Sequence, residues 1–516
     1  MELNLQKQIG QLFMVGFDAT EVDAHIARMI QQYHVGGVIL FRRNVESPQQ
    51  VARLCRDLQE LNAKVSEIPL LIAIDQEGGM VMRVEQGVTA IPSAMAFQEA
   101  GSERDCEQLM RVSGEEMRAI GINMILAPVL DVNNNPLNPV IGVRAFGEDA
   151  ETVIQFGMAA LHGLQNSGVV ATAKHFPGHG DTLTDSHFTM PVVGHDMARL
   201  NSVELRPFKA AIAEGVPAIM TAHVVFPAIE HAPDLPATLS QRVLTGLLRN
   251  ELGFKGVIVT DCLEMAAISD GVGVAQGAVA TLQAGSDLVL ISHLEDRQAS
   301  AVERVVSAVA SGEISAQRME QALQRILELK QTRAVANWRN APLLPVGLMK
   351  PEALDLSRRV HKASLRVMGD FHPLRPTLPI HLITVELLTR TEVDETVADE
   401  EHRQSMLAAM VKAGLEVSEY RLPFNATHEE LTAALRFTAR AEQIVIQSYN
   451  AVLSAAQQKL LAALPHDKLW LVAGRLPYDL DLVPDARARL ANFSCRPDAL
   501  LPVVEMLTGQ TTNRQH

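Results

Sequence analysis

The chain has 516 residues, with 47% hydrophobic and 20% charged residues and a formal net charge of −15. This length exceeds what one hydrophobic core normally serves, so we expect two or three soluble globular domains. The acidic balance argues against nucleic acid and against an anionic membrane surface as partners. No apolar run reaches membrane-spanning length, and the N-terminus lacks a signal-peptide pattern. The four cysteines are scattered without zinc-site spacing, and we interpret them as reduced thiols of a cytoplasmic protein.

Up to about residue 335, short apolar runs typical of buried strands alternate with helical patterns. The expected strands cover 13–17, 37–41, 70–75, 124–128, 169–175, 218–223, 257–261 and 288–292. The expected helices include 23–33, 48–63, 104–120, 152–165, 200–214, 241–252 and 274–284, and further helices over 301–335 complete the pattern. Eightfold strand–helix alternation predicts an α/β fold of the (β/α)8 TIM-barrel type over residues 1–335. An open, doubly wound sheet is the alternative, since alternation alone does not prove closure.

The segment 336–352 loses this periodicity and is rich in proline, so we expect a linker there. Residues 353–516 then form a second unit. Its expected strands cover 380–385, 443–447 and 469–473, and its expected helices cover 405–414, 428–438 and 455–464. This pattern predicts a smaller C-terminal α/β sandwich domain.

The expected strands of the barrel end in polar or titratable residues. Five of the apolar runs end in, or are followed by, such residues: Asp75, Asp131, the pair Lys174 and His175, His223, and Asp261. A barrel places the carboxyl ends of its strands around one mouth, so these residues should line one pocket. We expect Glu77, in the glycine-rich turn after Asp75, to be a structural hydrogen-bond acceptor.

A glycine-rich loop after the strand at 169–175 carries a second group of titratable residues. Asp185 and His187 are two residues apart, so the carboxylate can fix the tautomer of the imidazole and raise its basicity. Asp261 ends an apolar strand, where a carboxylate is costly without partners or a function. A carboxylate nucleophile opposite an aspartate-tuned histidine is the logic of a double-displacement glycosidase. Arg83, Arg144 and Lys174 would donate to sugar hydroxyls or an acyl group.

The block from Lys174 to His187 resembles the KHFPGHG…DSH signature of the NagZ-like β-N-acetylglucosaminidases of glycoside hydrolase family 3. The resemblance extends, in order, over residues 74–83, 127–132, 141–146, 236–240 and 256–265, and more weakly over 474–480. It implies that Asp261 is the nucleophile, His187 the acid/base and Asp185 its partner. It also implies that Asp75, Arg83, Arg144, Lys174 and His175 hold a terminal N-acetylglucosamine. It implies no metal and no organic cofactor.

The implied activity is a retaining exo-β-N-acetylglucosaminidase acting on peptidoglycan turnover fragments or chito-oligosaccharides, with the small glycoside as its partner. A phosphorylase on the same scaffold is an alternative, because a neutral histidine repels phosphate less than a carboxylate does. A β-glucosidase or xylosidase is a third reading, which Asp185 and His187 disfavour. A sugar-binding protein without turnover is a fourth, and retention of Asp261 and His187 speaks against it. Met80 and Cys262 depart from the family pattern beside site residues, which puts the aglycone preference in doubt.

Overall fold

A computed structural model of the chain describes residues 4–183, 190–340, 344–386 and 405–510. Its first part contains eight parallel strands that lie in the sheet in chain order. They are β1 (Phe13–Val15), β2 (Gly37–Leu40), β3 (Leu71–Ile74), β6 (Met124–Ile125), β7 (Val170–Phe176), β8 (Ala218–Thr221), β9 (Val257–Val259) and β10 (Val289–Ile291). β10 pairs with β1, and a parallel bridge between Val259 and Leu288 joins β9 to the start of β10. The sheet therefore closes on itself, which confirms the predicted barrel and excludes the open sheet.

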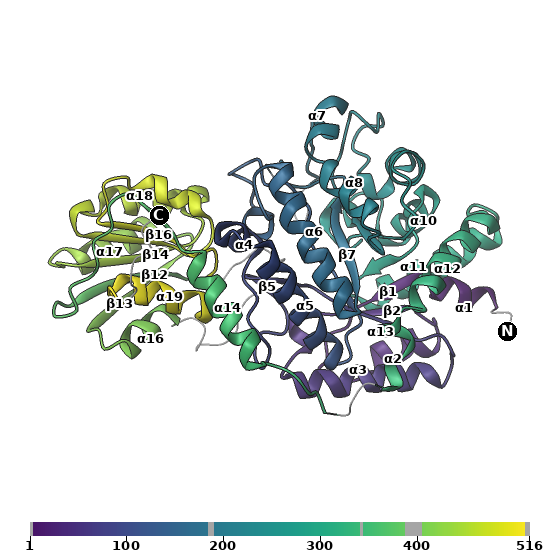
Figure 1. The fold of residues 1–516 in the computed structure, drawn as a ribbon. Coiled ribbons are helices and arrows are strands. Elements are labelled where there is room, and N and C mark those ends of the chain that lie inside the picture. Colours follow the sequence, from purple (N-terminus) through teal and green to yellow (C-terminus); the bar gives the residue numbers. More distant parts are fainter. Residues whose placement is uncertain (1–3, 184–189, 341–343, 387–404, 511–516) are drawn as a thin grey trace.

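Helices surround this barrel (Figure 1). In chain order they are α1 (Leu5–Gly10), α2 (Ala24–Gln31), α3 (Pro48–Ala63), α4 (Ala94–Ala100), α5 (Glu103–Ala119), α6 (Ala150–Ser167), α7 (Met197–Ser202), α8 (Arg206–Ala213), the π-helical η4 (Arg242–Glu251), α9 (Ala266–Ser269), α10 (Val274–Ala284), α11 (Glu295–Ala310), α12 (Ala316–Lys330) and α13 (Arg333–Ala336). Their ends carry clear sequence signals. At α6, for example, the Asp149 side chain accepts from Thr152 N, and Gly168 ends the helix at φ 91°.

One predicted helix is wrong in its extent. The segment 200–214, expected to be continuous, is divided between α7 and α8. Val203 leaves the helical region at φ −126° and ψ −76°, and Pro207 lies in the first turn of α8. Proline lacks a backbone N–H and is tolerated at the start of a helix, so it favours a new helix here over continuation of the first one.

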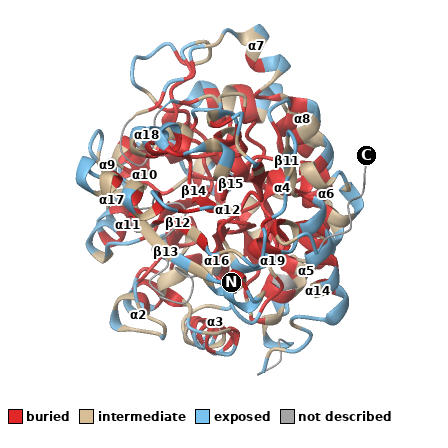
Figure 2. Ribbon diagram, turned by 90° about the vertical axis from the view of Figure 1, so that its left-hand side faces the viewer, coloured by how far each residue is buried: buried red, intermediate tan, exposed pale blue. Residues whose placement is uncertain are grey.

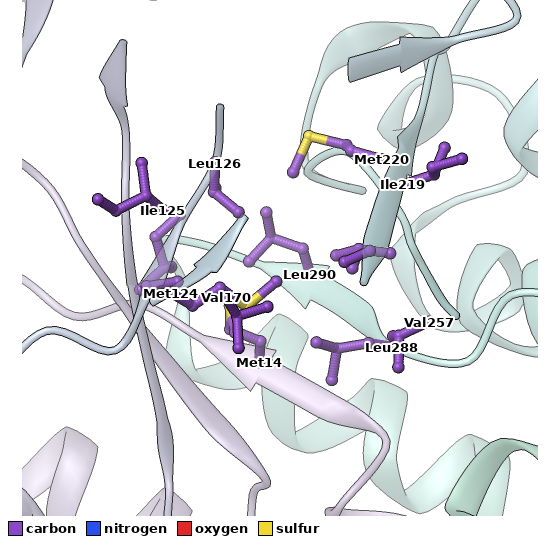
Figure 3. Close-up of a cluster of buried hydrophobic side chains, with 14 of the residues drawn as sticks. Met14, Met124, Ile125, Leu126, Val170, Ile219, Met220, Val257, Leu288 and Leu290 are labelled. Carbon is purple, nitrogen blue, oxygen red and sulfur yellow. The ribbon is translucent and has the colours of Figure 1, made fainter. Parts of the chain in front are cut away.

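The inside of the barrel is a packed core (Figure 3). Met14, Met124, Val170 and Leu290 come from different strands and are all at most 2% exposed. Buried residues fill the strands and the inward helix faces, and exposed residues lie on the outside (Figure 2). A filled interior leaves polar groups room only at the two ends of the barrel, so the site must lie at the mouth.

The second part of the chain forms a six-stranded sheet in the order β11-β16-β15-β14-β12-β13. Its strands are β11 (Arg366–Met368), β12 (Ile380–Glu386), β13 (Val417–Pro423), β14 (Ile444–Ser448), β15 (Leu469–Ala473) and β16 (Ala488–Ala491). The helices are α14 (Pro351–Ala363), α16 (Ser405–Lys412), α17 (His428–Thr438), α18 (Ala455–Ala463) and α19 (Pro497–Leu507). β12, β14 and β15 match the predicted strands, whereas β11, β13 and β16 were not predicted.

Alternating side chains of these strands serve two different cores. Ile444 and Ile446 pack with α17 and α18, whereas Val445 between them packs with α16 and α19. This period of two is what a strand covered on both faces requires. The domain is therefore an α/β sandwich with helices on both sides of the sheet, as predicted (Figure 1).

The two domains share an apolar interface. Met80, Met95 and Val143 of the barrel part belong to the same buried cluster as Leu476 and Phe493 of the second domain. A Cβ added at Gly142 would lie 2.7 Å from Leu476 Cδ2, so the barrel loop and the second domain are in close contact there. Met80, a departure from the family pattern, is thus an interface residue that is 1% exposed.

Polar contacts flank this apolar patch. The Arg496 guanidinium donates to the carbonyl oxygens of Gly79 and Met80 and pairs with Glu85 at 2.6 Å. Tyr478 donates to the Glu148 carboxylate at 2.6 Å and accepts from Asn133 at 3.0 Å. The second domain therefore contacts two barrel loops, the one that forms the hairpin of β4 (Gln76–Gly78) and β5 (Val81–Met82) and the one around residues 133–148.

Within the part of the chain that the structure describes, no helix has both the length and the apolar character needed to span a membrane.

Lys330, the last residue of α12, is buried at 4% exposure against the start of the barrel. Its Nζ donates at 2.7 Å to Gln11 Oε1 and at 2.7 Å to the Gly36 carbonyl oxygen, both of which are neutral acceptors. Burial without a carboxylate partner disfavours the ammonium form, which lowers the pKa of Lys330 to about 7.

This shift predicts a pH-dependent stability. Between pH 7 and the ordinary lysine value of 10.5 the unfolded chain holds a proton that the folded chain has lost. The contribution of Lys330 to the free energy of unfolding therefore rises with pH in this window and is least favourable below it. The free energy of unfolding of Lys330→Met, relative to that of the parent protein, should be highest near pH 6.5. This advantage should disappear by pH 10. The hydrogen bonds of Lys330 that the variant loses cost the same at every pH. The measurement that tests the shift is therefore the change with pH in the stability difference between variant and parent.

Urea denaturation across this range measures the difference between Lys330→Met and the parent protein. Lys412→Met, a change at an exposed position of α16, is the matched control. A difference that does not vary with pH would contradict the assignment.

Candidate active site

The carboxyl ends of the barrel strands carry the predicted site residues. Asp75 directly follows β3, Lys174 and His175 lie within β7, and Asp261 follows Thr260 at the end of β9. Asp75 and Asp261 are partly exposed, whereas Lys174 and His175 are buried. The mouth thus presents two carboxylates to solvent above a buried polar layer.

Ion pairs connect the loop after β3, the loop after β6 and the strand β7. Lys174 Nζ lies 2.7 Å from Asp75 Oδ1 and 2.7 Å from Glu77 Oε1. The Arg144 guanidinium binds the Glu77 carboxylate through two bonds of 2.8 Å. Arg83 Nη2 lies 3.5 Å from Asp75 Oδ2. The set thus combines three cations with two carboxylates. We call Asp75, Glu77, Arg83, Arg144 and Lys174 the cation cluster.

The cluster fixes the ionisation of its buried members. Burial alone would raise the pKa of Glu77, but Arg144 and Lys174 outweigh it and hold that pKa far below its usual value. Burial opposes the charge of Lys174, yet Asp75 and Glu77 raise its pKa above the ordinary lysine value. Both groups are therefore charged throughout the physiological pH range. Glu77, expected to be only a hydrogen-bond acceptor in a turn, is the shared anion of the cluster.

His175 is oriented by Asp131, a carboxylate with no exposed surface. His175 Nδ1 donates to Asp131 Oδ2 at 2.7 Å, and Asp131 Oδ1 accepts from His179 N at 2.7 Å. Burial would raise the pKa of Asp131, but the two histidines lower it, so the residue remains an anion. The carboxylate accepts only, so His175 Nδ1 is the ring nitrogen that carries a proton in this contact.

Asp261 is supported by a second buried histidine. His223 Nε2 donates to the carbonyl oxygen of Cys262 at 2.9 Å, and Thr238 lies 2.7 Å from His223 Nδ1. Asp261 Oδ1 itself accepts from Cys262 N at 2.7 Å. His223 and Thr238 thus hold the backbone that immediately follows Asp261. Burial, and then Glu264, raise the pKa of the Cys262 thiol to about 12, so this departure from the family pattern is a neutral buried group.

Asp185 and His187 lie outside the described residues, so their catalytic roles remain predictions. The approach to them is tightly packed. A Cβ at Gly180 would lie 1.8 Å from the Val132 carbonyl oxygen, which only glycine allows. Asn138 Nδ2 donates to the carbonyl oxygens of His179 and Gly180 at 2.9 and 3.0 Å. The start of this loop is therefore held against the loop that follows β6.

The structure brings Asp75, Arg83, Arg144 and Lys174 into one cluster and places His175 next to Lys174 on β7. Sequence reasoning missed the contribution of the second domain, since nothing in the local pattern around Tyr478 or Arg496 links them to residues more than 300 positions away. The weak resemblance over 474–480 was the one signal near this contact.

Comparisons with known proteins identify the family of the chain. The model of the glycosyl hydrolase family 3 N terminal domain matches residues 4–329. A beta-hexosaminidase A from Pseudoalteromonas piscicida is 35% identical over 333 residues, which are 60% of this chain and 56% of the relative. A beta-hexosaminidase from Methylobacillus flagellatus is 39% identical over 292 residues, 55% of this chain and 80% of the relative. The chain thus spans little more than half the length of the first relative.

A solved structure resembles the chain over both domains. It is a glycoside hydrolase family 3 beta-N-acetylglucosaminidase from Paenibacillus sp. str. FPU-7, with a TM-score of 0.93 and 43% identity over 99% of this chain and 98% of that one. The family model covers more than half of the chain and all the described residues of the cation cluster. The protein therefore belongs to glycosyl hydrolase family 3.

Proposed function

We propose that the protein is a retaining exo-β-N-acetylglucosaminidase that hydrolyses terminal β-linked N-acetylglucosamine. The observation that carries the proposal is the mouth of the barrel, where partly exposed Asp261 shares the strand ends with a buried cation cluster around Asp75. The likeness over both domains to a family 3 beta-N-acetylglucosaminidase supports this choice of sugar.

The reaction proceeds by double displacement. An Asp261 carboxylate oxygen forms a bond to the anomeric carbon while the bond to the leaving oxygen breaks, and His187 gives that oxygen its proton. Water then attacks the glycosyl-enzyme, His187 takes the proton from water, and the bond to Asp261 breaks. Asp185 accepts from the other imidazole nitrogen and holds the ring in the required tautomer.

The terminal sugar is held by Asp75, Arg83, Arg144, Lys174 and His175. Asp75 is anchored by Lys174 at 2.7 Å, so its carboxylate is fixed in place to accept from sugar hydroxyls. The guanidinium and ammonium groups of the cluster are donors suited to hydroxyl and acyl oxygens. Peptidoglycan turnover fragments and chito-oligosaccharides carry the required terminal sugar, and we place the protein in the cytoplasm, where its four buried free cysteines remain reduced.

The second domain supports the sugar site from outside. Arg496 holds the backbone of Gly79 and Met80, in the turn between Glu77 and Arg83. Tyr478 holds Asn133, and Asn133 Oδ1 accepts from Gly142 N, two residues before Arg144. The second domain thereby positions residues that hold the sugar without being assigned any contact with it.

The first test is release of 4-nitrophenol from its β-N-acetylglucosaminide and its β-glucoside, each with and without phosphate. We expect turnover of the N-acetylglucosaminide that is indifferent to phosphate. Phosphate-stimulated turnover with sugar 1-phosphate as product would establish the phosphorylase instead. Preference for the glucoside would overturn the assigned sugar, and saturable binding without turnover would indicate a sugar-binding protein.

Variants test the roles of the two catalytic groups. Asp261→Ala should abolish turnover, because no carboxylate remains to form the glycosyl-enzyme. His187→Ala should slow substrates with poor leaving groups by about 100-fold or more but affect 4-nitrophenyl glycosides much less, since nitrophenolate leaves with little protonation. His428→Ala, at an exposed helix position of the second domain, is the control. Equal losses of His187→Ala on both substrate types would argue against the acid role.

Arg496→Ala tests the positioning role of the second domain. Without the hydrogen bonds from Arg496 to the Gly79 and Met80 carbonyl oxygens, KM should rise about 10-fold, equivalent to about 1.4 kcal/mol. The change in kcat should be smaller. Arg496→Lys should recover part of the loss, because one ammonium cannot reach all three acceptors. Arg436→Ala, at an exposed position of α17, is the control, and urea unfolding checks the fold. An unchanged KM in Arg496→Ala would refute the role.

A further inference from the structure

Asp181, His195 and Glu204 form a second cluster near the loop that carries Asp185 and His187. One ligand atom from each of these three residues lies within 4.8 Å of the other two. Asp181 precedes and His195 follows the segment 184–189, and Glu204 lies between α7 and α8. His195 Nε2 donates to Asp181 Oδ2. The cluster thus joins the two sides of this loop to the helices outside the barrel.

Only one of the two carboxylate oxygens of Glu204 has hydrogen-bond partners. Its side chain is 3% exposed, and Oε1 accepts from Asn134 Nδ2 at 3.2 Å and lies 3.4 Å from Arg199 Nε. Oε2 is buried and has no hydrogen-bond partner, and neither has Asn134 Oδ1 beside it. An ionised oxygen buried without a partner is costly, so the arrangement indicates that something else binds Oε2.

The chemistry of the cluster matches a divalent metal ion. Imidazole nitrogen and carboxylate oxygen bind Zn²⁺ at about 2.0–2.2 Å, so two ligands of one ion are at most about 4.4 Å apart. The observed spread of up to 4.8 Å needs only small side-chain movements. Asp181 and His195 are 22% and 37% exposed, which gives an ion a route from solvent to the buried Glu204. Two carboxylates neutralise the charge of the ion.

We propose that Asp181, His195 and Glu204 bind one Zn²⁺ ion that fastens the two sides of the loop together. On binding, the proton on His195 Nε2 passes to solvent, and the nitrogen lone pair and the two carboxylates bind the metal. The ion is structural and takes no part in the glycosidase chemistry, so this site stands independently of the proposed function. One imidazole with two carboxylates suits a borderline transition metal better than Mg²⁺ or Ca²⁺, which prefer oxygen alone.

A second group of possible ligands among the described residues, Cys262, Glu264 and His293, is a weaker candidate. Glu264 already accepts from the backbone N–H groups of His293 and Leu294 at 2.6 and 3.0 Å. Its carboxylate is therefore satisfied by the protein itself, and the group serves as a matched control.

The test is titration of chelator-treated full-length protein with Zn²⁺ by calorimetry. We expect one ion per chain, with affinity reduced at least about 10-fold in Glu204→Gln and in His195→Gln, because losing even a group that hydrogen-bonds a metal ligand has that effect. Glu264→Gln and Cys262→Ser should bind as the parent does. Zn²⁺ should also raise the Tm of the parent more than that of Glu204→Gln.

Cobalt distinguishes the two groups directly. Co²⁺ bound at Asp181, His195 and Glu204 should show visible absorption without a thiolate-to-metal charge-transfer band, whereas ligation by Cys262 would produce that band. Absence of saturable Zn²⁺ binding to the parent protein would overturn the proposal. So would binding that survives both Glu204→Gln and His195→Gln, or that disappears in Cys262→Ser. If the Glu204→Gln variant does not fold, because Glu204 is buried, His195→Gln still tests the proposal. His195 is partly exposed, so its replacement disturbs the packing less.

Discussion

The ion pairs that Glu77 makes with Arg144 and Lys174 are the interaction on which the barrel mouth depends. Glu77 follows β3, Arg144 lies in the loop after β6, and Lys174 lies in β7, so one buried carboxylate joins two loops and a strand. Such pairs repay the cost of desolvation only when every member has its partners. Lys174 extends the set to Asp75, which is partly exposed. The buried charges therefore fix the position of the one carboxylate of the cluster that solvent reaches.

The second domain acts on the same loops from the opposite side. An apolar patch around Met80 and Val143 is buried against it, and Arg496 and Tyr478 fix the backbone beside that patch. A surface loop seldom packs tightly by itself, because it has little apolar surface to bury. Here the loops that carry Glu77 and Arg144 are packed between a barrel and a sandwich. This arrangement gives the second domain a physical role in the site even though its sequence shows no catalytic pattern.

Hydrogen bonds, and not the cation cluster, position the remaining strand ends of the mouth. Asp131 holds His175, and Thr238 with His223 holds the chain after Asp261. Asp131 and His175 come from the ends of neighbouring strands, and His223, after β8, contacts the backbone of Cys262, after β9. Hydrogen bonds between strand ends fix the geometry of the mouth without filling it, because the apolar core lies below it.

The local pattern of apolar and polar residues determined most of the secondary structure of the barrel. The eight apolar runs predicted the eight strands, since a strand buried on both faces needs a continuous apolar segment. Polar residues at the ends of five of these runs were predicted to meet at the mouth, and among them Asp75 contacts Lys174 and Asp131 contacts His175. Three strands of the second domain were missed because their patterns are weak: β11 has no fully buried residue, β13 is largely half-buried, and β16 spans four residues. The predicted helix 200–214 was too long because periodicity does not register the break before Pro207.

Only the tertiary structure decided which charges pair. The sequence predicted Arg144 and Lys174 as site residues, but it did not reveal that Glu77 is their shared partner or that Arg496 contacts the turn after Glu77. Strand and helix patterns arise from neighbours a few positions apart, and a sequence displays these directly. An ion pair between positions 77 and 144, or a hydrogen bond between 79 and 496, depends on how distant segments pack, and that packing is settled by the whole buried core.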